Sequence, residues 1–132
     1  MSSGKITLEQ RKASLRYHVQ EYRKRRVIID TDAACEADDP FAIAQALMSK
    51  MLEVKGICAE HFVEEGSMEQ SYEMICRVTE AMGTEVPVLR GQTGKMSEHH
   101  GEPMTEAAQF IVGEAMKLSL IHISEPTRPI SI

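Results

Sequence analysis

The apolar positions in the first half of the chain follow two patterns, one typical of buried strands and one typical of helices. Residues 27–29 form a β-branched run of the kind found in a strand buried on both faces. Apolar residues then recur at helical spacing and predict a helix with a buried stripe, made of Ile43, Ala46, Leu47 and Met51. Residues 54–59 predict a second strand. The order of strand, helix and strand indicates an α/β chain with a mainly parallel sheet.

The alternation of predicted helices and strands continues through the second half. A helix is predicted to open at Ser67, with Ser67 and Gln70 as a capping box, and to end at Gly83. Its inner stripe is expected to contain Tyr72, Ile75, Cys76, Thr79 and Met82. Residues 86–89 predict a short third strand, and Pro87 within it suits an edge or a strand start.

A polar loop and a last helix complete this pattern. Residues 91–103 contain glycine and the pair His99-His100, which is interpreted as part of a solvated loop. Residues 104–117 predict a helix that turns one side inward. That side is expected to consist of Ala107, Ala108, Ile111 and Ala115.

Residues 1–26 are interpreted as a helical extension that precedes the α/β part. Residues 1–5 are expected to be disordered, and Thr7 with Gln10 can form a capping box. One helical face is then predicted to carry Leu8, Leu15, Val19 and Tyr22. The basic cluster at residues 23–26 is more typical of a helix end that leads into a strand than of a nucleic-acid contact.

Composition narrows the class of protein. The chain has 132 residues, enough for one domain, and its net charge of −5 with 5% aromatic residues argues against a nucleic-acid partner. Cys35, Cys58 and Cys76 are odd in number and predict free thiols in a reducing compartment. Because no apolar run approaches roughly 20 residues and no signal peptide is recognisable, the expected location is the cytoplasm, with no membrane partner.

All aspartates of the chain lie together. The four are Asp30, Asp32, Asp38 and Asp39, whereas the other acidic residues are glutamates spread from end to end. Asp30 and Asp32 follow the first strand two residues apart, which places them on the same side of an extended backbone. Asp39 is positioned to be the N-cap of the next helix, before Pro40 at its first position. Carboxylates therefore gather at the carboxyl end of a strand, where open α/β sheets bind ligands.

Such a group of carboxylates needs something to offset its repulsion. The side chains either raise one another's pKa values or recruit a hard cation such as calcium or magnesium. A bound cation also lowers the pKa of a coordinated water, from which an aspartate can then take a proton as general base. In the simpler interpretation, Asp39 only caps a helix and Asp38 is a solvated loop residue.

The stretch D-T-D-A-A-C-E-A-D-D-P-F-A-I-A-Q-A-L resembles the N-terminal signature of the inosine–uridine-preferring nucleoside hydrolase family. The common form there is D-x-D-P-G-x-D-D. This chain has Ala33-Ala34 in place of Pro-Gly, two extra loop residues, and Cys35 where a longer-loop branch usually has Asn. Weaker similarity continues to about Lys117. The resemblance implies a Rossmann-like, mainly parallel sheet flanked by helices, truncated here after about three strands.

The resemblance also implies an activity and roles for single residues. The family hydrolyses the N-glycosidic bond of ribonucleosides with a bound Ca²⁺ that grips the ribose. By position, Asp32 would be calcium ligand and general base, Asp39 a second ligand, and Asp30 a support of the metal site from the strand. Asp38 would bind the ribose. The implied partner is a small-molecule nucleoside, and the full-length protein is expected to be a homo-oligomer.

One histidine lies near the implied site. His61 follows the second strand, where the family reaches its substrate, so His61 could face the nucleoside or the metal. The alternative is a hydrogen-bonded structural histidine at a strand end.

The last residues have a different character. Residues 118–128 resemble the translation of a sequencing adapter, so residues 118–132 are interpreted as a tail outside the natural protein and residues 27–117 as the N-terminal part of a hydrolase domain. Family members are much longer and draw further calcium ligands from later strands. The chain alone is therefore expected to bind calcium weakly and to turn over little or no nucleoside.

Two other functions fit parts of the pattern. In a haloacid-dehalogenase-like phosphatase, Asp30 would be the nucleophile and Asp32 the acid/base. Ala34 then stands where that pattern usually has Thr or Val, and Asp38 and Asp39 would have no role. The other alternative is a non-catalytic, cation-dependent module that binds a nucleoside or sugar without cleaving it.

Overall fold

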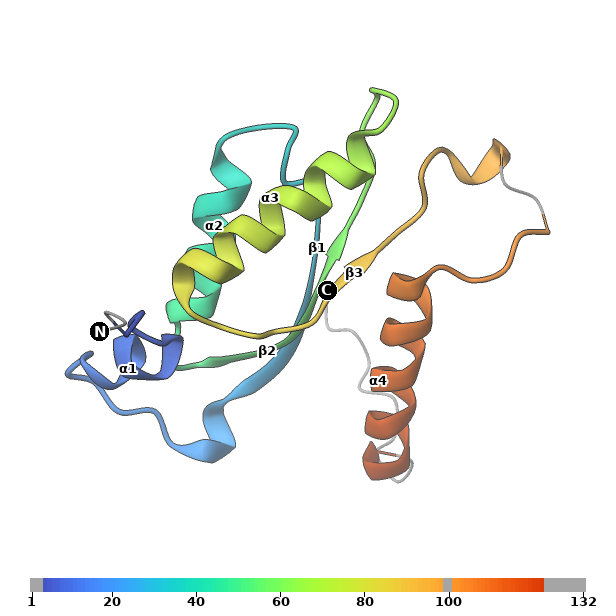
Figure 1. Cartoon of the computed structure of the whole chain (residues 1–132). Coiled ribbons are helices and arrows are strands. Elements are labelled where there is room, and N and C mark those ends of the chain that lie inside the picture. Colours follow the sequence, from blue (N-terminus) through green and yellow to red (C-terminus); the bar gives the residue numbers. More distant parts are fainter. Residues whose placement is uncertain (1–3, 99–100, 123–132) are drawn as a thin grey trace, which may run out of the picture.

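The chain alternates strands and helices along most of its length (Figure 1). The computed structural model describes residues 4–98 and 101–122. The expectations for residues 1–3, for His99 and His100, and for residues 123–132 lie outside this part. The elements are α1 (Leu8–Ala13), η1 (Glu21–Arg23), β1 (Arg25–Thr31), α2 (Asp38–Met48), β2 (Leu52–Ala59), α3 (Ser67–Met82), β3 (Val88–Arg90), η2 (Met96–Glu98) and α4 (Glu106–His122).

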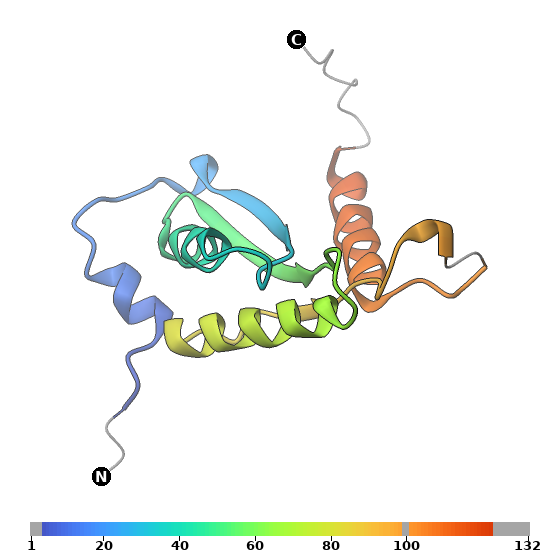
Figure 2. The ribbon, with the colours of Figure 1, turned by 90° about the horizontal axis from the view of Figure 1, so that it is seen from above.

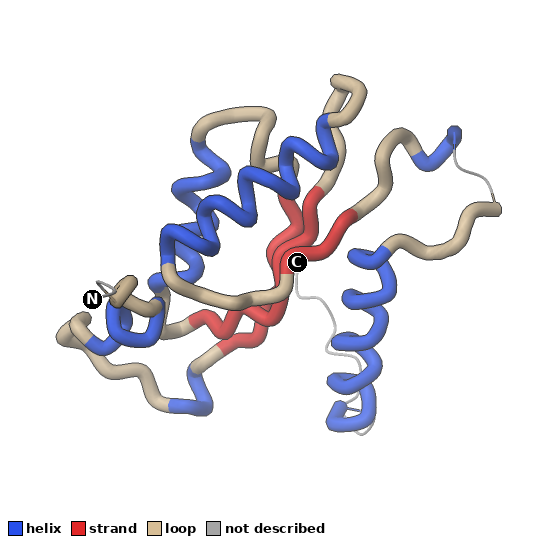
Figure 3. Tube along the Cα trace, in the orientation of Figure 1, coloured by secondary structure: helices blue, strands red, loops and turns tan. Residues whose placement is uncertain are grey.

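The strands form one parallel sheet in the order β1-β2-β3, which appears in red in Figure 3. The α/β class with a parallel sheet and flanking helices is thus confirmed. In the register, Thr31 lies beside Ala59, so β1 and β2 end at the same level. The expected burial of residues 27–29 on both faces is wrong, since β1 is an edge strand and these residues are only half-buried.

Helices cover both faces of this sheet. α2 and α3 pack on one face and on each other, while α4 contacts β3 and lies on the opposite face, apart from the other two in Figure 2. The largest fully buried side chains of the core come from α2, β2 and α3 and include Ile43, Leu47, Ile57 and Ile75.

α4 is held to the sheet by its first turns. A Cβ at Gly56 of β2 would lie 2.4 Å from the Phe110 ring, so the glycine makes room for this aromatic side chain. Ala107 is buried and Ala108 half-buried, as predicted. The inward positions expected for Ile111 and Ala115 are wrong, because both are exposed where α4 extends past the contact.

α2 begins two residues earlier than predicted. Its N-cap is Ala37, so Asp39 lies within the first turn and the predicted N-cap role of Asp39 is wrong. Pro40 is tolerated there because the first N–H groups of a helix have no intrahelical partner. Ile43 and Leu47 are buried as expected, whereas Met51 lies beyond the end of α2 and is exposed.

α3 shows the predicted end but not the predicted cap. Gly83 ends the helix in the left-handed conformation, with φ 76°. The N-cap is Gly66, and the predicted capping box of Ser67 and Gln70 is wrong. The Ser67 hydroxyl instead accepts from the Phe62 N–H at 2.8 Å and donates to the Phe62 carbonyl at 3.0 Å. Ile75 and Thr79 are buried as expected, and so are three residues outside the predicted stripe, Ser67, Met68 and Ser71.

The N-terminal helix is shorter than its apolar spacing suggested. The capping box of Thr7 and Gln10 is confirmed, and Leu8 is buried in the core. However, α1 ends at Ala13, so the predicted face that continues to Tyr22 is wrong. The Lys50 ammonium donates to the carbonyls of Leu15 and Tyr17, which holds the following segment in a non-helical path.

Candidate functional site

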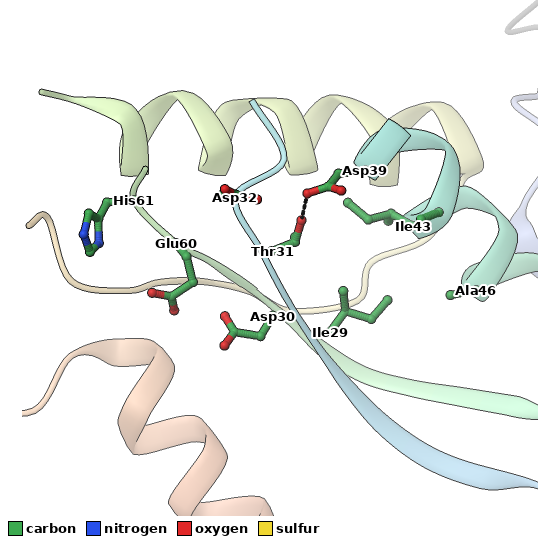
Figure 4. Close-up of a pocket in the computed structure, with 10 residues that line it drawn as sticks. Ile29, Asp30, Thr31, Asp32, Asp39, Ile43, Ala46, Glu60 and His61 are labelled. Atoms are coloured by element: carbon green, nitrogen blue, oxygen red, sulfur yellow. Dashed lines mark hydrogen bonds between the residues drawn. The ribbon is translucent and has the colours of Figure 1, made fainter. Parts of the chain in front are cut away.

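A pocket of about 550 Å³ opens where β1 and β2 end and α2 begins (Figure 4). This is the edge at which parallel α/β sheets bind ligands. The pocket is lined by Ile29, Asp30, Thr31, Asp32, Asp39, Ala42, Ile43, Ala46, Glu60 and His61. Sequence reasoning placed Asp30, Asp32, Asp39 and His61 at one site, and the structure brings these four residues to one pocket.

Asp39 is held by the end of β1. The Thr31 hydroxyl donates to Asp39 Oδ2 at 2.7 Å, and this half-buried bond joins the strand to the first turn of α2. The carboxylate also lies at the positive end of the helix dipole, which stabilises its charge. Asp39 is therefore oriented toward the pocket by both elements.

Thr31→Val is expected to lower the free energy of unfolding by about 1 kcal/mol, because it removes the donor to a half-buried carboxylate and keeps the shape of the side chain. Urea denaturation measures this loss. Thr93→Val, at an exposed threonine in the loop after β3, is the matched control and should change stability little. An equal loss in both variants would contradict a specific role of the Thr31 hydroxyl.

Asp32 begins the loop between β1 and α2. Its carbonyl accepts from the Cys35 N–H at 2.8 Å, which forms a turn. The loop is anchored by Ala33, which is 1% exposed, and by the Ala34 N–H, which donates to the Ser71 hydroxyl at 3.4 Å. Because β1 ends at Thr31, the alternation of side chains between the two faces of the strand does not extend to Asp32. Asp30 and Asp32 both line the pocket, and Figure 4 draws Asp30 beside Glu60.

Asp30 lies next to Glu60, a residue that the sequence analysis did not single out. The Glu60 N–H donates to the Thr31 carbonyl at 2.9 Å and extends the pairing of β1 and β2 by one residue. Burial, and then the neighbouring Asp30 carboxylate, raise the pKa of Glu60 to about 7. The position directly after β2 is the only sequence signal that could have indicated Glu60.

His61 is at the end of the pocket away from Asp39 and Ile43 (Figure 4). The residue is half-buried, and its Nδ1 is buried with no hydrogen-bond partner within the described part of the chain. The hydrogen-bonding capacity of the Nδ1 atom is therefore unused within the described part of the chain. Asp38, which the resemblance assigned to ribose, is exposed at the start of α2 and is not among the residues that line the pocket.

Cysteine chemistry is not favoured at this site. Cys35, Cys58 and Cys76 are all free, as predicted. Desolvation, and then the nearby carboxylates of Asp32 and Glu36, raise the pKa of the exposed Cys35 thiol. Burial raises the pKa of Cys58 to about 11. Both thiols therefore carry their protons at neutral pH, which disfavours a thiolate nucleophile.

The donor set fits calcium only in part. Asp32 and Asp39 offer the hard carboxylate oxygens that calcium prefers, but calcium takes about six to eight such ligands. Over residues 4–98 and 101–122, no three His, Cys, Asp or Glu side chains are grouped so that they could hold one metal ion. The described residues therefore do not complete a calcium coordination shell.

Comparisons with known proteins do not identify a family, so the class of protein is defined by its α/β architecture alone. No family model matches the chain, and searches of curated proteins and of solved structures find no significant match. In the described residues, no helix has both the length and the apolar character needed to cross a membrane.

Proposed function

We propose that the chain carries the N-terminal part of a nucleoside-hydrolase-like site, which cleaves the N-glycosidic bond of a ribonucleoside or a related N-ribosyl compound. The observation that carries the proposal is the shared pocket of Asp32 and Asp39 at the carboxyl ends of parallel strands. The aspartate signature of this segment supports the same function. The Rossmann-like fold of that family is the finer architecture that we propose.

The proposal gives each side chain a role at the pocket. Asp32, whose carboxylate has no hydrogen bond or ion pair among the described residues, takes the proton from the attacking water as general base. Asp39, fixed by Thr31, orients its oxygens toward the same space. His61 contacts the nucleoside from the far end of the pocket. Asp38 would reach the ribose only after a change of position, since it is exposed outside the pocket.

Calcium enters this proposal through Asp32 and Asp39. Together with oxygen donors beyond those of the described residues, the two carboxylates would hold Ca²⁺, which lowers the pKa of a bound water. With so few ligands, we expect the chain alone to bind calcium weakly and to hydrolyse little nucleoside. The cytoplasm remains our proposed location, in keeping with the free thiols.

Asp32→Asn tests the proposal. In NMR titrations of the isotope-labelled chain with Ca²⁺, we expect shifts at residues 30–39 and at Glu60 and His61, and a loss of affinity of about tenfold in the variant, since one of two anionic ligands becomes neutral. Added inosine should then shift the His61 signals in the presence of Ca²⁺.

The matched control is Glu36→Gln, which neutralises an exposed carboxylate in the same loop. It should leave the calcium titration nearly unchanged. If calcium causes no shifts around the pocket, or if both variants bind equally well, the proposed metal and base roles of Asp32 are wrong. Robust inosine hydrolysis by the unaltered chain would contradict the expectation of an incomplete site.

The geometry supports a phosphatase less well. A nucleophilic Asp30 would have to approach an anionic phosphate, whereas a second carboxylate, that of Glu60, lies next to Asp30 and disfavours an anion there. Release of phosphate from an aryl phosphate with Mg²⁺ would favour that alternative. Nucleoside binding without cleavage, by a complete hydrolase-like protein, would favour the non-catalytic binding module.

A further inference from the structure

Another pocket, called here the helix pocket, lies between α1, α2 and α3. It has a volume of about 680 Å³ and includes no residue of a strand. Its apolar lining comes from Ile6 before α1, Ala44 and Met48 of α2, and Met82 of α3. An apolar lining with a few polar groups is typical of small-molecule sites. The proposed hydrolase-like function uses none of these residues.

Arg11 supplies the charge of the helix pocket. Of the residues that line the pocket in the described part of the chain, Arg11 alone is charged. Its Nη2 donates one long bond, 3.4 Å, to the Ala81 carbonyl, and its Nε is buried with no hydrogen-bond partner among residues 4–98 and 101–122. Within the same residues, no carboxylate forms an ion pair with Arg11. The half-buried guanidinium has therefore lost contact with water without gaining an anion, and this cost would be offset by an anion in the pocket.

The helix pocket and the candidate functional site favour ligands of opposite charge. The pocket at the carboxyl ends of β1 and β2 is lined by Asp30, Asp32, Asp39 and Glu60, which disfavour a further anion. In the helix pocket, a planar guanidinium lies among apolar side chains instead. A guanidinium pairs with a carboxylate through two parallel hydrogen bonds, a geometry that favours carboxylates over other small anions. Charge and lining together fit an organic carboxylate.

We propose that the helix pocket binds a small carboxylic acid with an apolar body, whose carboxylate pairs with Arg11. The apolar body contacts Met48 and Met82. The side-chain amide of Gln45 lines the same pocket, has no hydrogen bond among the described residues, and is a further donor to the carboxylate. This site is separate from the hydrolase-like pocket and does not depend on the function proposed there.

Such a ligand touches all three helices at once. α1 is joined to the end of α3 by the bond from the Leu8 N–H to the Gly83 carbonyl, at 2.9 Å, and is otherwise held there by Arg11 and by the exposed ion pair of Lys5 and Glu80. A ligand that bridges Arg11 of α1 to Met48 of α2 and Met82 of α3 adds contacts that the unfolded chain lacks. Binding therefore stabilises the packing of α1 on the α/β part.

Titration of the full 132-residue chain with 3-phenylpropionate tests the site without any substitution. In a chain labelled with ¹³C at the methionine methyl groups, the phenyl ring should shift the signals of Met48 and Met82. The signals of exposed Met96 and Met104 should stay unchanged. A dissociation constant of about 1 mM is expected for a ligand of this size. The matched amide, 3-phenylpropionamide, has the same apolar body without the charge and should bind at least about tenfold more weakly.

Arg11→Gln should weaken the binding of 3-phenylpropionate by about tenfold or more, because it removes the charged donor. Arg11→Lys keeps the charge but loses the paired donors, so its affinity should lie between the two. The matched control is Lys12→Gln, at the next residue of α1, which lines a different pocket and should leave the affinity nearly unchanged. The amide signals of Leu8 and Gly83 in each free variant report whether α1 stays in place.

Three results would overturn the proposal. The first is the absence of shifts at Met48 and Met82 at about ten times the expected dissociation constant. The second is equal binding of the acid and the amide, which would remove the role of the charge. The third is an equal loss of affinity in Arg11→Gln and Lys12→Gln. Because the acid and the amide are compared on the unaltered chain, their comparison decides the question even if Arg11→Gln displaces α1.

Discussion

Gly83→Ala is expected to lower the free energy of unfolding by about 3 kcal/mol, through two separate effects. Gly83 ends α3 with φ 76°, a conformation in which a side chain costs about 1–2 kcal/mol. A Cβ there would also lie 2.4 Å from the Ile6 carbonyl oxygen and 2.9 Å from the Thr7 Cα. Because these are backbone atoms, the N-terminal segment must move away, which breaks the 2.9 Å bond from the Leu8 N–H to the Gly83 carbonyl.

Gly66→Ala is the matched control, because the two glycines flank the same helix. Gly66 has nearly the same φ, 75°, but no atom lies within 4 Å of its virtual Cβ. Its substitution should therefore cost only the conformational part, about 1–2 kcal/mol. Urea denaturation of both variants gives the difference. Equal losses would show that the segment before α1 does not pack on the end of α3.

The strands and helices of the α/β part could be predicted from the sequence because local pattern and burial agree there. The β-branched run at residues 27–29 lies in β1, and the spacing of Ile43 and Leu47 marks the buried side of α2. The same reasoning failed before β1. Leu15, Val19 and Tyr22 have helical spacing, but none of them is buried, so nothing stabilises a continuous helix against the alternative contacts of Lys50.

The cap predictions at Asp39 and Ser67 failed for a related reason. Asp39 and Ser67 are suitable cap residues by type, yet each side chain is bonded to a group that the local sequence does not specify. The Thr31 hydroxyl donates a hydrogen bond to the Asp39 carboxylate, and the Phe62 N–H donates one to the Ser67 hydroxyl. These bonds connect the ends of strands to the starts of helices, and they decide the cap geometry at both places. Sequence propensity ranks candidates for a cap and does not include such competing partners.

Which residues line the candidate site depends on the register of the sheet. The aspartate spacing was sufficient to place Asp32 and Asp39 at one pocket, because both follow the same strand within a short loop. Glu60 is thirty residues from Asp30 and meets it only because Thr31 pairs with Ala59. A one-residue shift of register would turn side chains to the other face of the sheet. This pairing could not be read from the sequence, and therefore the carboxylate pair was missed.

Glu60→Gln is expected to change how stability depends on pH. The pKa of Glu60 is about 7 in the folded chain and 4.5 ordinarily, so the folded state binds this proton more tightly than the unfolded state. The group thus contributes stability that is fully present below about pH 4.5 and lost as pH rises through about 7. The full shift corresponds to about 3 kcal/mol, and because Glu60 is partly exposed, solvent screening reduces the expected effect to about 1–2 kcal/mol.

The variant cannot ionise at this position, so its free energy of unfolding should exceed that of the unaltered chain above about pH 7 and lose the advantage toward about pH 4.5. Urea denaturation across this pH range measures how the difference in free energy of unfolding between the two chains changes. Glu73→Gln, at an exposed glutamate of α3, should leave the pH profile nearly parallel to that of the unaltered chain. Parallel profiles for Glu60→Gln would mean that Asp30 and Glu60 do not share the pocket edge as close neighbours, because only their proximity and burial hold the proton on Glu60.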